Sequence, residues 1–540
     1  MLSLLLALAQ PAMADAPDNW KFSLDGYYRV RGFVFPDMFP GQVKPGTYMT
    51  HKIRLQPGLN FQDRAKFFIM ADMLDGVVFG DNQSVASTAL FAGDPTNTSI
   101  RGTAMDPLTI KRAWMEFKVP VGLVRVGRQA SNWGMGLLAN EGNGFDDTFG
   151  ENQYGSTYDR AIFATRPISI VQTIMKKRDS GIPLVVAVGV DRLVEDPLIQ
   201  YYGYKCDPEK DGEEGCTETE DHGYDEDRTE ANRNDTWWVD GQDDVWEMIY
   251  VLSYRGEGIA LPGGRVGDLI GGVYAVNRMQ TETSSNVLIL DAYGKVEVAN
   301  IYAEGEILHI GGNTEAIAMA GAENVGAESP LFKKADIWGY VVRAGYQNRT
   351  FTGYLEHGYA SGDPNVADAE FTGRPLHPDY NVGLLLYEEI LARSTATVWG
   401  PDVQGLWSNG GVYNSRYIFP TVKYRPLDNW ELLGGFLMAW PDKADGSRIR
   451  CSPDDPVPEG QDPNRWKDKC NASADMLGYE IDLAVKHKFH DHINFTMEGG
   501  YAHVTDRIPL SSVGLDYRVN DKGQEVGDFW TFQTRIAYEF

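Results

Sequence analysis

The dominant pattern along this chain is a two-residue alternation of apolar and polar side chains. Successive side chains of a β-strand point to opposite faces, so this alternation predicts strands with one apolar and one polar face. The pattern recurs in about 18 segments of the chain. They cover residues 20–35, 47–61, 64–75, 108–119, 122–129, 158–167, 183–193, 244–256, 264–279, 286–298, 300–310, 334–347, 350–361, 411–425, 428–440, 474–488, 491–504 and 527–540.

The last of these segments has the clearest alternation. Trp530, Phe532, Ile536, Tyr538 and the terminal Phe540 share one face, and polar side chains occupy the other. A strand that runs to an aromatic carboxy terminus resembles the final strand of a bacterial outer-membrane β-barrel. The resemblance implies that Tyr538 and Phe540 belong to the signal read by the barrel-assembly machinery. Taken alone, the segment also fits an edge strand of a soluble β-sandwich.

The connections between the segments alternate between short and long. Short links lie at 62–63, 120–121, 299, 348–349, 426–427 and 490–491. Long connections lie at 76–107, 130–157, 194–243, 311–333, 362–410, 441–473 and 505–526. A transmembrane barrel has short periplasmic turns on one rim and long extracellular loops on the other. Two connections depart from the rhythm, because 168–182 is long for a turn and 280–285 is short for a loop.

We therefore expect an all-β fold, a transmembrane antiparallel β-barrel of about 18 strands, within a range of about 16–18. The chain opens with the apolar run 2–8 and the small residues Ala12 and Ala14, which predict a secretory signal over residues 1–14. The run is far shorter than the roughly 20 residues that span a bilayer. It lacks Lys and Arg, so the true start could lie upstream. We expect residues 15–540 to form a single barrel in the bacterial outer membrane.

The inward face of each strand would line the lumen, and its charges change along the chain. The first strands and the last strand place basic residues inward. These are Arg29, Arg31, Lys52, Arg54, Lys66, Arg112, Lys118, Arg125 and Arg535. The middle strands place acidic residues inward. These are Asp291, Glu297, Glu304, Glu306 and Glu356.

Two hypotheses account for this charge pattern. Strand order becomes angular position in a closed barrel, so a basic and an acidic wall would face each other across the pore. Such a field orients dipolar solutes and tunes ion selectivity. The alternative is local pairing between adjacent strands, for example between Glu116 and a basic residue of a neighbouring strand.

One motif region carries a more specific resemblance. It reads Arg-Ala-Trp-Met-Glu-Phe over 112–117, Gly-Arg-Gln over 127–129 and Trp-Gly-Met-Gly over 133–136. This run is similar to the alginate-export-like barrels and related proteobacterial outer-membrane proteins. In that family lumen arginines select a polyuronate, so the resemblance implies such a role for Arg112, Arg125 and Arg128, and a monomer. The acidic wall departs from a purely anion-selective pore.

The predicted loops contain further candidate features. Cys206 with Cys216 and Cys451 with Cys470 form two close pairs, which in an exported protein predict two disulfides that staple loops. Free thiols are the alternative. Residues 205–244 hold 16 acidic against 4 basic side chains. We expect a solvated loop there, although the carboxylates of Asp225, Glu226 and Asp227 could bind Ca²⁺ or bridge it to anionic lipid.

A helical pattern interrupts the long loop 362–410. Leu384, Tyr387 and Leu391 recur at helical spacing between Tyr380 and Arg393. We expect a short helix that caps the loop; the alternative is a helix folded into the pore mouth.

Composition and motifs narrow the function. A net charge of -27 argues against nucleic-acid binding. No G-x-S-x-G or H-E-x-x-H motif is present, so we expect no enzyme and no cofactor beyond the possible Ca²⁺. A barrel of this size is wide enough for an aqueous channel. The chain is therefore expected to pass small hydrophilic solutes passively, in contact with outer-membrane lipid and lipopolysaccharide. The alternatives are an exporter of an anionic polysaccharide and a non-conducting surface or adhesion barrel.

Overall fold

The computed structural model describes most of the strands and the loops that pack against them. The described residues are 20–36, 38, 46–79, 108–142, 148–152, 155–177, 180–195, 245–261, 265–280, 285–314, 333–364, 370–396, 408–443, 449–457, 462–464 and 470–540. The expected signal 1–14 and most of the expected loops 76–107, 194–243 and 311–333 lie outside these residues.

Most of the described chain is β-strand. The strands are β1 (Trp20–Phe35), β2 (Gly46–Phe61), β3 (Ala65–Val78), β4 (Thr109–Val119), β5 (Gly122–Ala130), β6 (Thr157–Thr165), β7 (Leu184–Glu195), β8 (Val245–Leu261), β9 (Arg265–Gln280), β10 (Ser285–Val298), β11 (Ile301–Thr314), β12 (Lys333–Gln347), β13 (Phe351–Ala360), β14 (Glu370–Phe371), β15 (Ser415–Leu427), β16 (Trp430–Pro441), β17 (Gly478–Phe489), β18 (Ile493–Val504), β19 (Arg518–Val519) and β20 (Glu525–Glu539). The helices are α2 (Pro167–Ile174), the π-helix η3 (Leu386–Leu391) and α5 (Ala392–Ala396).

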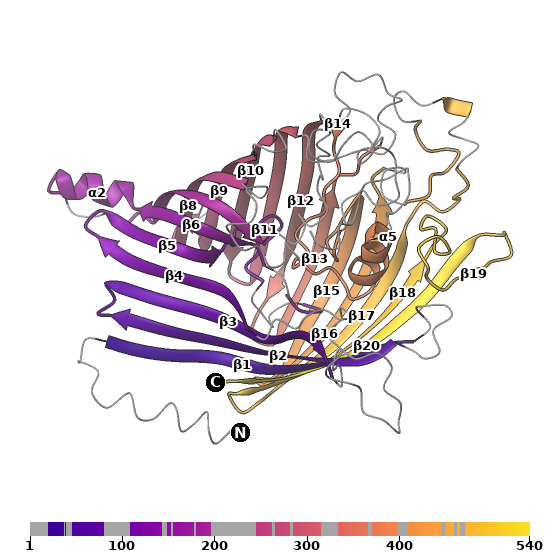
Figure 1. Ribbon diagram of the computed structural model, residues 1–540, viewed down its shortest axis with the longest axis horizontal. Coiled ribbons are helices and arrows are strands. Elements are labelled where there is room, and N and C mark those ends of the chain that lie inside the picture. Colours follow the sequence, from indigo (N-terminus) through magenta and orange to yellow (C-terminus); the bar gives the residue numbers. More distant parts are fainter. Residues whose placement is uncertain are drawn as a thin grey trace, which may run out of the picture.

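Eighteen of these strands form one closed antiparallel barrel (Figure 1). Each strand pairs with the next along the chain, apart from the two-residue strands β14 and β19, which pair at the margins of β12 and β20. Closure comes from β1 and β20, where Tyr28 lies opposite Tyr538 and Val30 opposite Ile536. The backbone of Phe540 also exchanges two hydrogen bonds of 3.0 Å with Gly26. The last strand therefore closes the barrel against 20–35, as the sequence predicts.

The outward surface of the barrel is an apolar belt. Alternate residues of most strands expose large aliphatic side chains in the middle of the wall. Examples are Val188, Val190, Leu252, Leu290, Val342, Leu355, Val422, Ile481, Leu483 and Ile536. Aromatic side chains flank the belt towards the strand ends. Examples are Trp20, Phe67, Phe117, Trp246, Trp338, Phe351, Trp430, Phe489, Trp530 and Tyr538. An apolar band between aromatic girdles is the outer surface of a membrane-spanning barrel.

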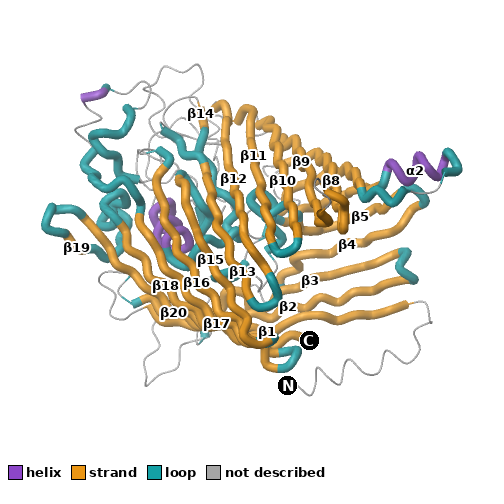
Figure 2. Tube along the Cα trace, turned by 180° about the vertical axis from the view of Figure 1, so that it is seen from behind, coloured by secondary structure: helices purple, strands orange, loops and turns teal. Residues whose placement is uncertain are grey.

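The hairpin turns lie on the rim that we take as periplasmic, and Figure 2 shows them from behind. Gln62 and Asp63 adopt positive φ values of 48° and 54° in the turn after β2, and the backbone N–H of Asp63 donates to Asn60 Oδ1 at 3.0 Å. Ala299 and His490 also have positive φ values in their turns. Helix α2 occupies much of the long connection 168–182, and β9 ends at Gln280 while β10 begins at Ser285. The two exceptions to the alternation of short and long connections are therefore features of the fold.

Among the described residues, no helix is long and apolar enough to cross a lipid bilayer.

The buried core lies inside the barrel. Residues of two inward-folded loops, among them Leu137, Phe149, Leu376 and Leu385, pack with inward side chains of the wall. In Figure 1, α5 is seen within the barrel outline, in front of β15 to β17. The strands thus supply one apolar surface for lipid and a second, mixed surface for the loops.

Leu483 tests the outward assignment, because its side chain is 63% exposed at the middle of β17. We predict that Leu483→Arg lowers the free energy of unfolding in bilayers by about 2–4 kcal/mol, the cost of a cation at the membrane midplane. Urea titration of the reconstituted barrel measures this value. Leu483→Ala, which adds no charge, is the matched control, and equal stability of the two variants would contradict a lipid-facing position.

Candidate functional site: the lumen and its two inward loops

Two loops fold into the lumen and define its geometry. The first inward loop comprises residues 131–156 between β5 and β6. The second inward loop comprises residues 361–414 between β13 and β15. Their described parts lie against the inner wall at several strands that are distant in sequence.

The first inward loop leaves β5 and crosses to the acidic side of the barrel. The Trp133 ring stacks on Tyr274 of β9, with ring centroids 5.7 Å apart. Glu306 of β11 then accepts hydrogen bonds from the backbone N–H groups of Met135 and Leu137, the second at 3.1 Å. A buried carboxylate that receives backbone donors needs no cation nearby. Glu306 therefore anchors the loop to the wall.

The same loop then reaches the basic side. Phe149 lies against Phe419 of β15, with ring centroids 6.0 Å apart. Beyond it, the Glu151 carboxylate forms ion pairs with Arg29, with Arg31 at 3.5 Å and with Arg535 at 3.3 Å. All of these side chains are buried. One loop carboxylate thus holds the arginines of the first and last strands together.

The charges around Glu151 alter its pKa. Burial raises the pKa of this carboxyl, but the guanidinium groups of Arg29, Arg31 and Arg535 outweigh burial and hold it at about 2, below the ordinary 4.5. Glu151 is consequently ionised throughout the physiological pH range. Its negative charge is part of the folded lumen.

The second inward loop is fixed to the wall at β17, which pairs with β18, the neighbour of β20. Glu480 of β17 accepts the backbone N–H groups of Leu384 and Leu385 at 2.6 and 2.8 Å, and that of Leu386 at 2.7 Å. These donors lie at the start of η3, where helical N–H groups have no partner within the helix. Just beyond, the Tyr387 hydroxyl hydrogen-bonds with Ser415 Oγ at 2.9 Å.

The two loops also hold each other. The backbone N–H of His377 donates to the Leu137 carbonyl at 2.7 Å, and its ring Nε2 lies 3.0 Å from Ser156 Oγ. The Asp379 carboxylate accepts the backbone N–H of Gly155 at 2.6 Å. The loops therefore form one packed body, which narrows the lumen.

Small residues on the wall make room for this body. A Cβ atom at Gly500 of β18 would lie 3.3 Å from the Cβ of Leu384 and 2.8 Å from Asp482 Oδ1. At Gly435 of β16, a Cβ would lie 2.9 Å from the Phe149 ring. Inward glycines thus lie where the loops approach most closely.

We expected a short helix that caps the loop 362–410, and this placement is wrong. The helical spacing between Tyr380 and Arg393 is real, since η3 and α5 occupy its second half. However, Leu384, Leu386 and Ile390 are buried in the lumen. The segment is almost continuously apolar, so burial against the wall stabilises it more than exposure at the barrel mouth would.

The structure places the predicted lumen residues as follows. The Arg29, Arg31 and Arg535 side chains meet at Glu151, as described above. Lys52 and Arg54 pair with Asp72 of β3 at 3.0 and 2.6 Å. Arg112 reaches Glu141 of the first inward loop at 3.4 Å. Lys66 and Lys118 lie near the periplasmic ends of β3 and β4 and are exposed.

Arg125 forms the adjacent-strand pair that the sequence suggests. Its Nε donates to Glu116 of β4 at 2.9 Å, and its guanidinium lies 4.4 Å from the centre of the Trp114 ring. On the middle strands, Arg343 of β12 links Glu356 and Glu304 at 2.6 and 3.3 Å. These two acidic residues are therefore paired with a cation that the sequence analysis did not select.

The remaining acidic candidates differ in their surroundings. Glu297 accepts a hydrogen bond from Gln347 at 2.7 Å. Asp291 is buried, and neither of its carboxylate oxygens has a hydrogen-bond partner among the described residues. Charged residues of adjacent strands therefore pair locally at Arg125, Arg54 and Arg343. The role of these residues in ion selectivity stays a prediction.

Arg128 does not share this lumen position. It pairs with Asp159 of β6 at 3.0 Å, and both side chains are partly exposed, at 38% and 50%. Its neighbour Gln129 is buried inside the barrel. Alternation along β5 therefore turns Arg128 outward, so the resemblance to alginate exporters does not extend to this residue.

The sequence analysis did not select three carboxylates that hold the lumen together, Glu480, Asp72 and Glu151. Glu480 and Asp72 lie at inward positions of strands that the alternation predicts, so counting inward carboxylates on all strands would have found them. Glu151 lies in a loop, and no local pattern marks it. Its partners Arg29 and Arg535 are respectively 122 and 384 residues away.

The structure describes only some of the cysteines and possible Ca²⁺ ligands predicted in the loops. Cys451 and Cys470 form a disulfide, as expected. Cys206, Cys216 and the possible Ca²⁺ ligands Asp225, Glu226 and Asp227 lie outside the described residues. Within those residues, no group of three or more His, Cys, Asp or Glu side chains is arranged to hold a metal ion.

The closed barrel, its outward apolar belt and its charged, loop-filled interior define the class as a porin-type outer-membrane β-barrel. Among solved structures, the chain is similar to OccK11 (OpdR) of Pseudomonas aeruginosa, with 10% identity and a TM-score of 0.46 over 96% of each chain.

Two further similarities are to the outer membrane channel DcaP of Acinetobacter baumannii and to OccK2 (OpdF) of Pseudomonas aeruginosa in complex with glucuronate. For DcaP the identity is 10% and the TM-score 0.40, over 97% of this chain and 99% of that one. For OccK2 the identity is 10% and the TM-score 0.44, over 96% and 98%. No protein-family model and no curated protein matches it, so the alginate-export-like resemblance is not confirmed.

Glu151 yields a pH prediction. Its pKa is depressed in the folded state, so its stabilisation is present above about pH 4.5 and is lost as pH falls through about 2. We expect Glu151→Gln to lower the free energy of unfolding by roughly 3 kcal/mol at neutral pH. Denaturant unfolding at pH 7, 4 and 2 compares the variant with wild type. The difference should shrink at pH 2, and a constant difference would exclude this ion-pair origin.

Glu480 tests the anchoring of the second inward loop. Glu480→Ala leaves the N–H groups of Leu384, Leu385 and Leu386 without their acceptor, each at a cost of about 1–3 kcal/mol if they stay buried. We expect the loop to leave the wall instead. Limited proteolysis should then cleave within 384–396 in the variant and not in wild type.

Glu431→Ala is the control for that experiment, because Glu431 of β16 pairs with Arg425 of β15 at 2.7 Å, within the wall itself. Equal protection of the loop in wild type and Glu480→Ala would show that the three hydrogen bonds do not anchor it.

Proposed function

We propose that this protein is a channel of the bacterial outer membrane through which small hydrophilic solutes diffuse passively. The observation that carries the proposal is the lumen wall, on which charged side chains stay partly exposed beside the packed loops. Arg125 keeps 38% of its side chain exposed and Arg343 keeps 23%. Lys423 and Lys486 are half-buried on the same inner surface. A barrel of 18 strands leaves an aqueous path at this width unless loops fill it completely.

The partners follow from the two surfaces of the barrel. The outward belt suits membrane lipid and lipopolysaccharide, and the aromatic end at Tyr538 and Phe540 suits the barrel-assembly machinery. The inward surface suits small solutes with polar groups. We propose a monomer as the working unit, with ion preference set by the mixed charges of the wall.

Export of an anionic polysaccharide is the weaker candidate. Its support is the motif over residues 112–136 and the inward arginines. However, Arg29, Arg31, Arg54 and Arg535 are each bound to a carboxylate, so they offer little free positive charge to a polyanion. The packing of two loops across the lumen likewise favours small solutes over a polymer.

Conductance across planar bilayers tests the channel. We expect ohmic current with modest ion preference in a KCl gradient. No current from correctly folded protein would exclude both channel functions and leave a surface or adhesion role. Block by long polyuronate chains at concentrations where uronate monomers have no effect would favour export.

Arg343 provides the residue-level test. Arg343→Ala removes the cation between Glu304 and Glu356, so two carboxylates remain unpaired in the lumen. We expect the reversal potential to shift towards the K⁺ equilibrium potential, because unpaired carboxylates favour cations.

Two controls separate charge from packing in this test. Arg343→Lys keeps the charge and should restore the wild-type potential. Tyr380→Phe removes the loop hydroxyl that Arg343 contacts at 3.3 Å and should leave the potential unchanged. An unaltered potential in Arg343→Ala would mean that ions do not pass this residue.

A further inference from the structure

Helix α2 lies in the connection between β6 and β7, on the rim that carries the hairpin turns. In both Figure 1 and Figure 2, α2 lies outside the outline of the strands, at the ends of β5 and β6. The helix begins at Pro167, a residue whose fixed φ suits the first helical position. It therefore extends away from the lumen, and nothing in the channel reading accounts for it.

The sequence of α2 has one apolar and one polar face. Helical spacing gathers the apolar side chains on one side, namely Pro167, Ile168, Ile170, Val171, Ile174 and the C-cap residue Met175. The polar side holds Ser169, Gln172 and Thr173. The Gln172 amide exchanges hydrogen bonds of 2.9 and 2.7 Å with Ser180, and the Thr173 hydroxyl donates to the Ser169 carbonyl at 2.8 Å. The polar side is therefore bound to the returning chain and to the helix itself.

The apolar face of α2 is uncovered by the rest of the chain. Val171, Met175 and Ile174 keep 53%, 56% and 75% of their surface exposed, and no residue of α2 is buried. A helix of 8 residues is marginal in water by itself, because most helical stability comes from packing of an amphipathic face. An apolar surface outside the chain is therefore needed to stabilise α2.

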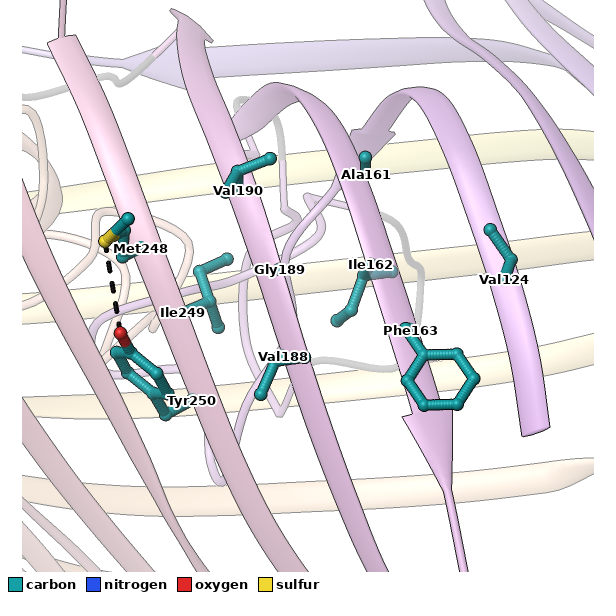
Figure 3. Close-up of a pocket in the computed structure, with 10 residues that line it drawn as sticks. All are labelled: Val124, Ala161, Ile162, Phe163, Val188, Gly189, Val190, Met248, Ile249 and Tyr250. Atoms are coloured by element: carbon teal, nitrogen blue, oxygen red, sulfur yellow. Dashed lines mark hydrogen bonds between the residues drawn. The ribbon is translucent and has the colours of Figure 1, made fainter. Parts of the chain in front are cut away.

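The lipid-facing wall of the barrel leads directly into this helix. Phe163 of β6 lies opposite Val188 of β7, and both side chains line an apolar groove on the outward wall (Figure 3). Strand β6 ends at Thr165, and α2 begins at Pro167. The apolar face of α2 is thus continuous along the chain with a surface that already contacts acyl chains.

Exposed basic side chains lie at both ends of α2. Arg166 precedes the helix, and Lys176 and Lys177 follow it. Residues 166–177 contain no acidic side chain. Long cationic side chains can lie with their aliphatic part along an apolar surface and their charge in the headgroup layer. Charge complementarity therefore favours a membrane surface with anionic headgroups over a neutral one.

We propose that α2 is an interfacial helix that docks in the inner leaflet of the outer membrane. Its apolar face lies among the acyl chains, and Arg166, Lys176 and Lys177 contact the headgroups of anionic phospholipids. Such helices lie in the membrane plane, with the apolar face about 5–10 Å into the boundary of headgroups and acyl chains. Docking fixes the depth of the β6–β7 edge in the leaflet. The inference is independent of ion passage and rests only on the outer-membrane location.

Spin labelling of the full chain in nanodiscs of phosphatidylcholine and phosphatidylglycerol tests the docking. One label is attached at Ile174→Cys on the apolar face and, in a second variant, at Thr173→Cys on the polar face. Wild-type protein taken through the same labelling gives the background from the native cysteines. We expect the label at 174 to collide more often with oxygen than with a water-soluble nickel complex, and the label at 173 to show the reverse. Equal ratios at the two positions, or greater nickel access at 174, would overturn the proposal.

The role of the basic side chains is tested separately. Lys176→Gln with Lys177→Gln should lower the ratio of oxygen to nickel collisions at 174, because the attraction to anionic headgroups is weakened. Omission of phosphatidylglycerol from the nanodiscs should lower it in the same way. If neither change alters the ratio, the assignment to anionic phospholipid is wrong.

Two further measurements guard against misfolding and self-association. Heat-modifiable migration on gels confirms folding of each variant, and Val171→Cys, on the same face, replaces Ile174→Cys if that variant does not fold. Spin–spin broadening between labels at 174 would contradict docking in lipid, since it would assign the apolar face to a second copy of the chain.

Discussion

The structure depends on one constraint: a charge buried on the inner wall of the barrel costs several kcal/mol unless it has a partner, so most of these charges are paired. The inward loops supply those partners. Glu151 joins the arginines of β1 and β20, and Glu306 and Glu480 receive backbone donors of the two loops. Closure of the barrel, docking of the loops and the width of the lumen are therefore consequences of the same set of interactions.

Because of this constraint, most inward charges stabilise the fold and do not form two opposed charged walls. Basic and acidic arcs do lie on different strands, but most of their members are engaged in pairs or in loop anchoring. Arg125, Arg343 and Lys423 are among the charged side chains that stay partly exposed to the lumen. A lumen built in this way contains local dipoles and not two opposed charged walls, and this supports the modest ion preference that we propose. It also couples the loops to the wall, since moving a loop would strip partners from buried charges.

The outward surface follows a simpler rule. Lipid requires apolar side chains on every second residue, and this requirement repeats along all the strands. Alternation was therefore enough to predict the strands, their boundaries within a few residues and the closing pair of β1 and β20. It was also enough to assign Arg29, Arg54 and Glu306 to the inner face. The outward pair of Arg128 and Asp159 departs from this rule near the extracellular ends of β5 and β6.

The sequence by itself determined the barrel, its topology and which side of each strand faces lipid, because these depend on local periodicity and on the lengths of the connections. It did not determine where the long loops go. Helical spacing found the segment from Tyr380 to Arg393, but its burial depends on Glu480, nearly a hundred residues later in the chain, at a separation of 94–96 residues. Glu151 meets Arg535 across 384 residues. Only the tertiary structure decided these contacts, because a buried charge can be satisfied by any partner that the closed barrel brings within reach.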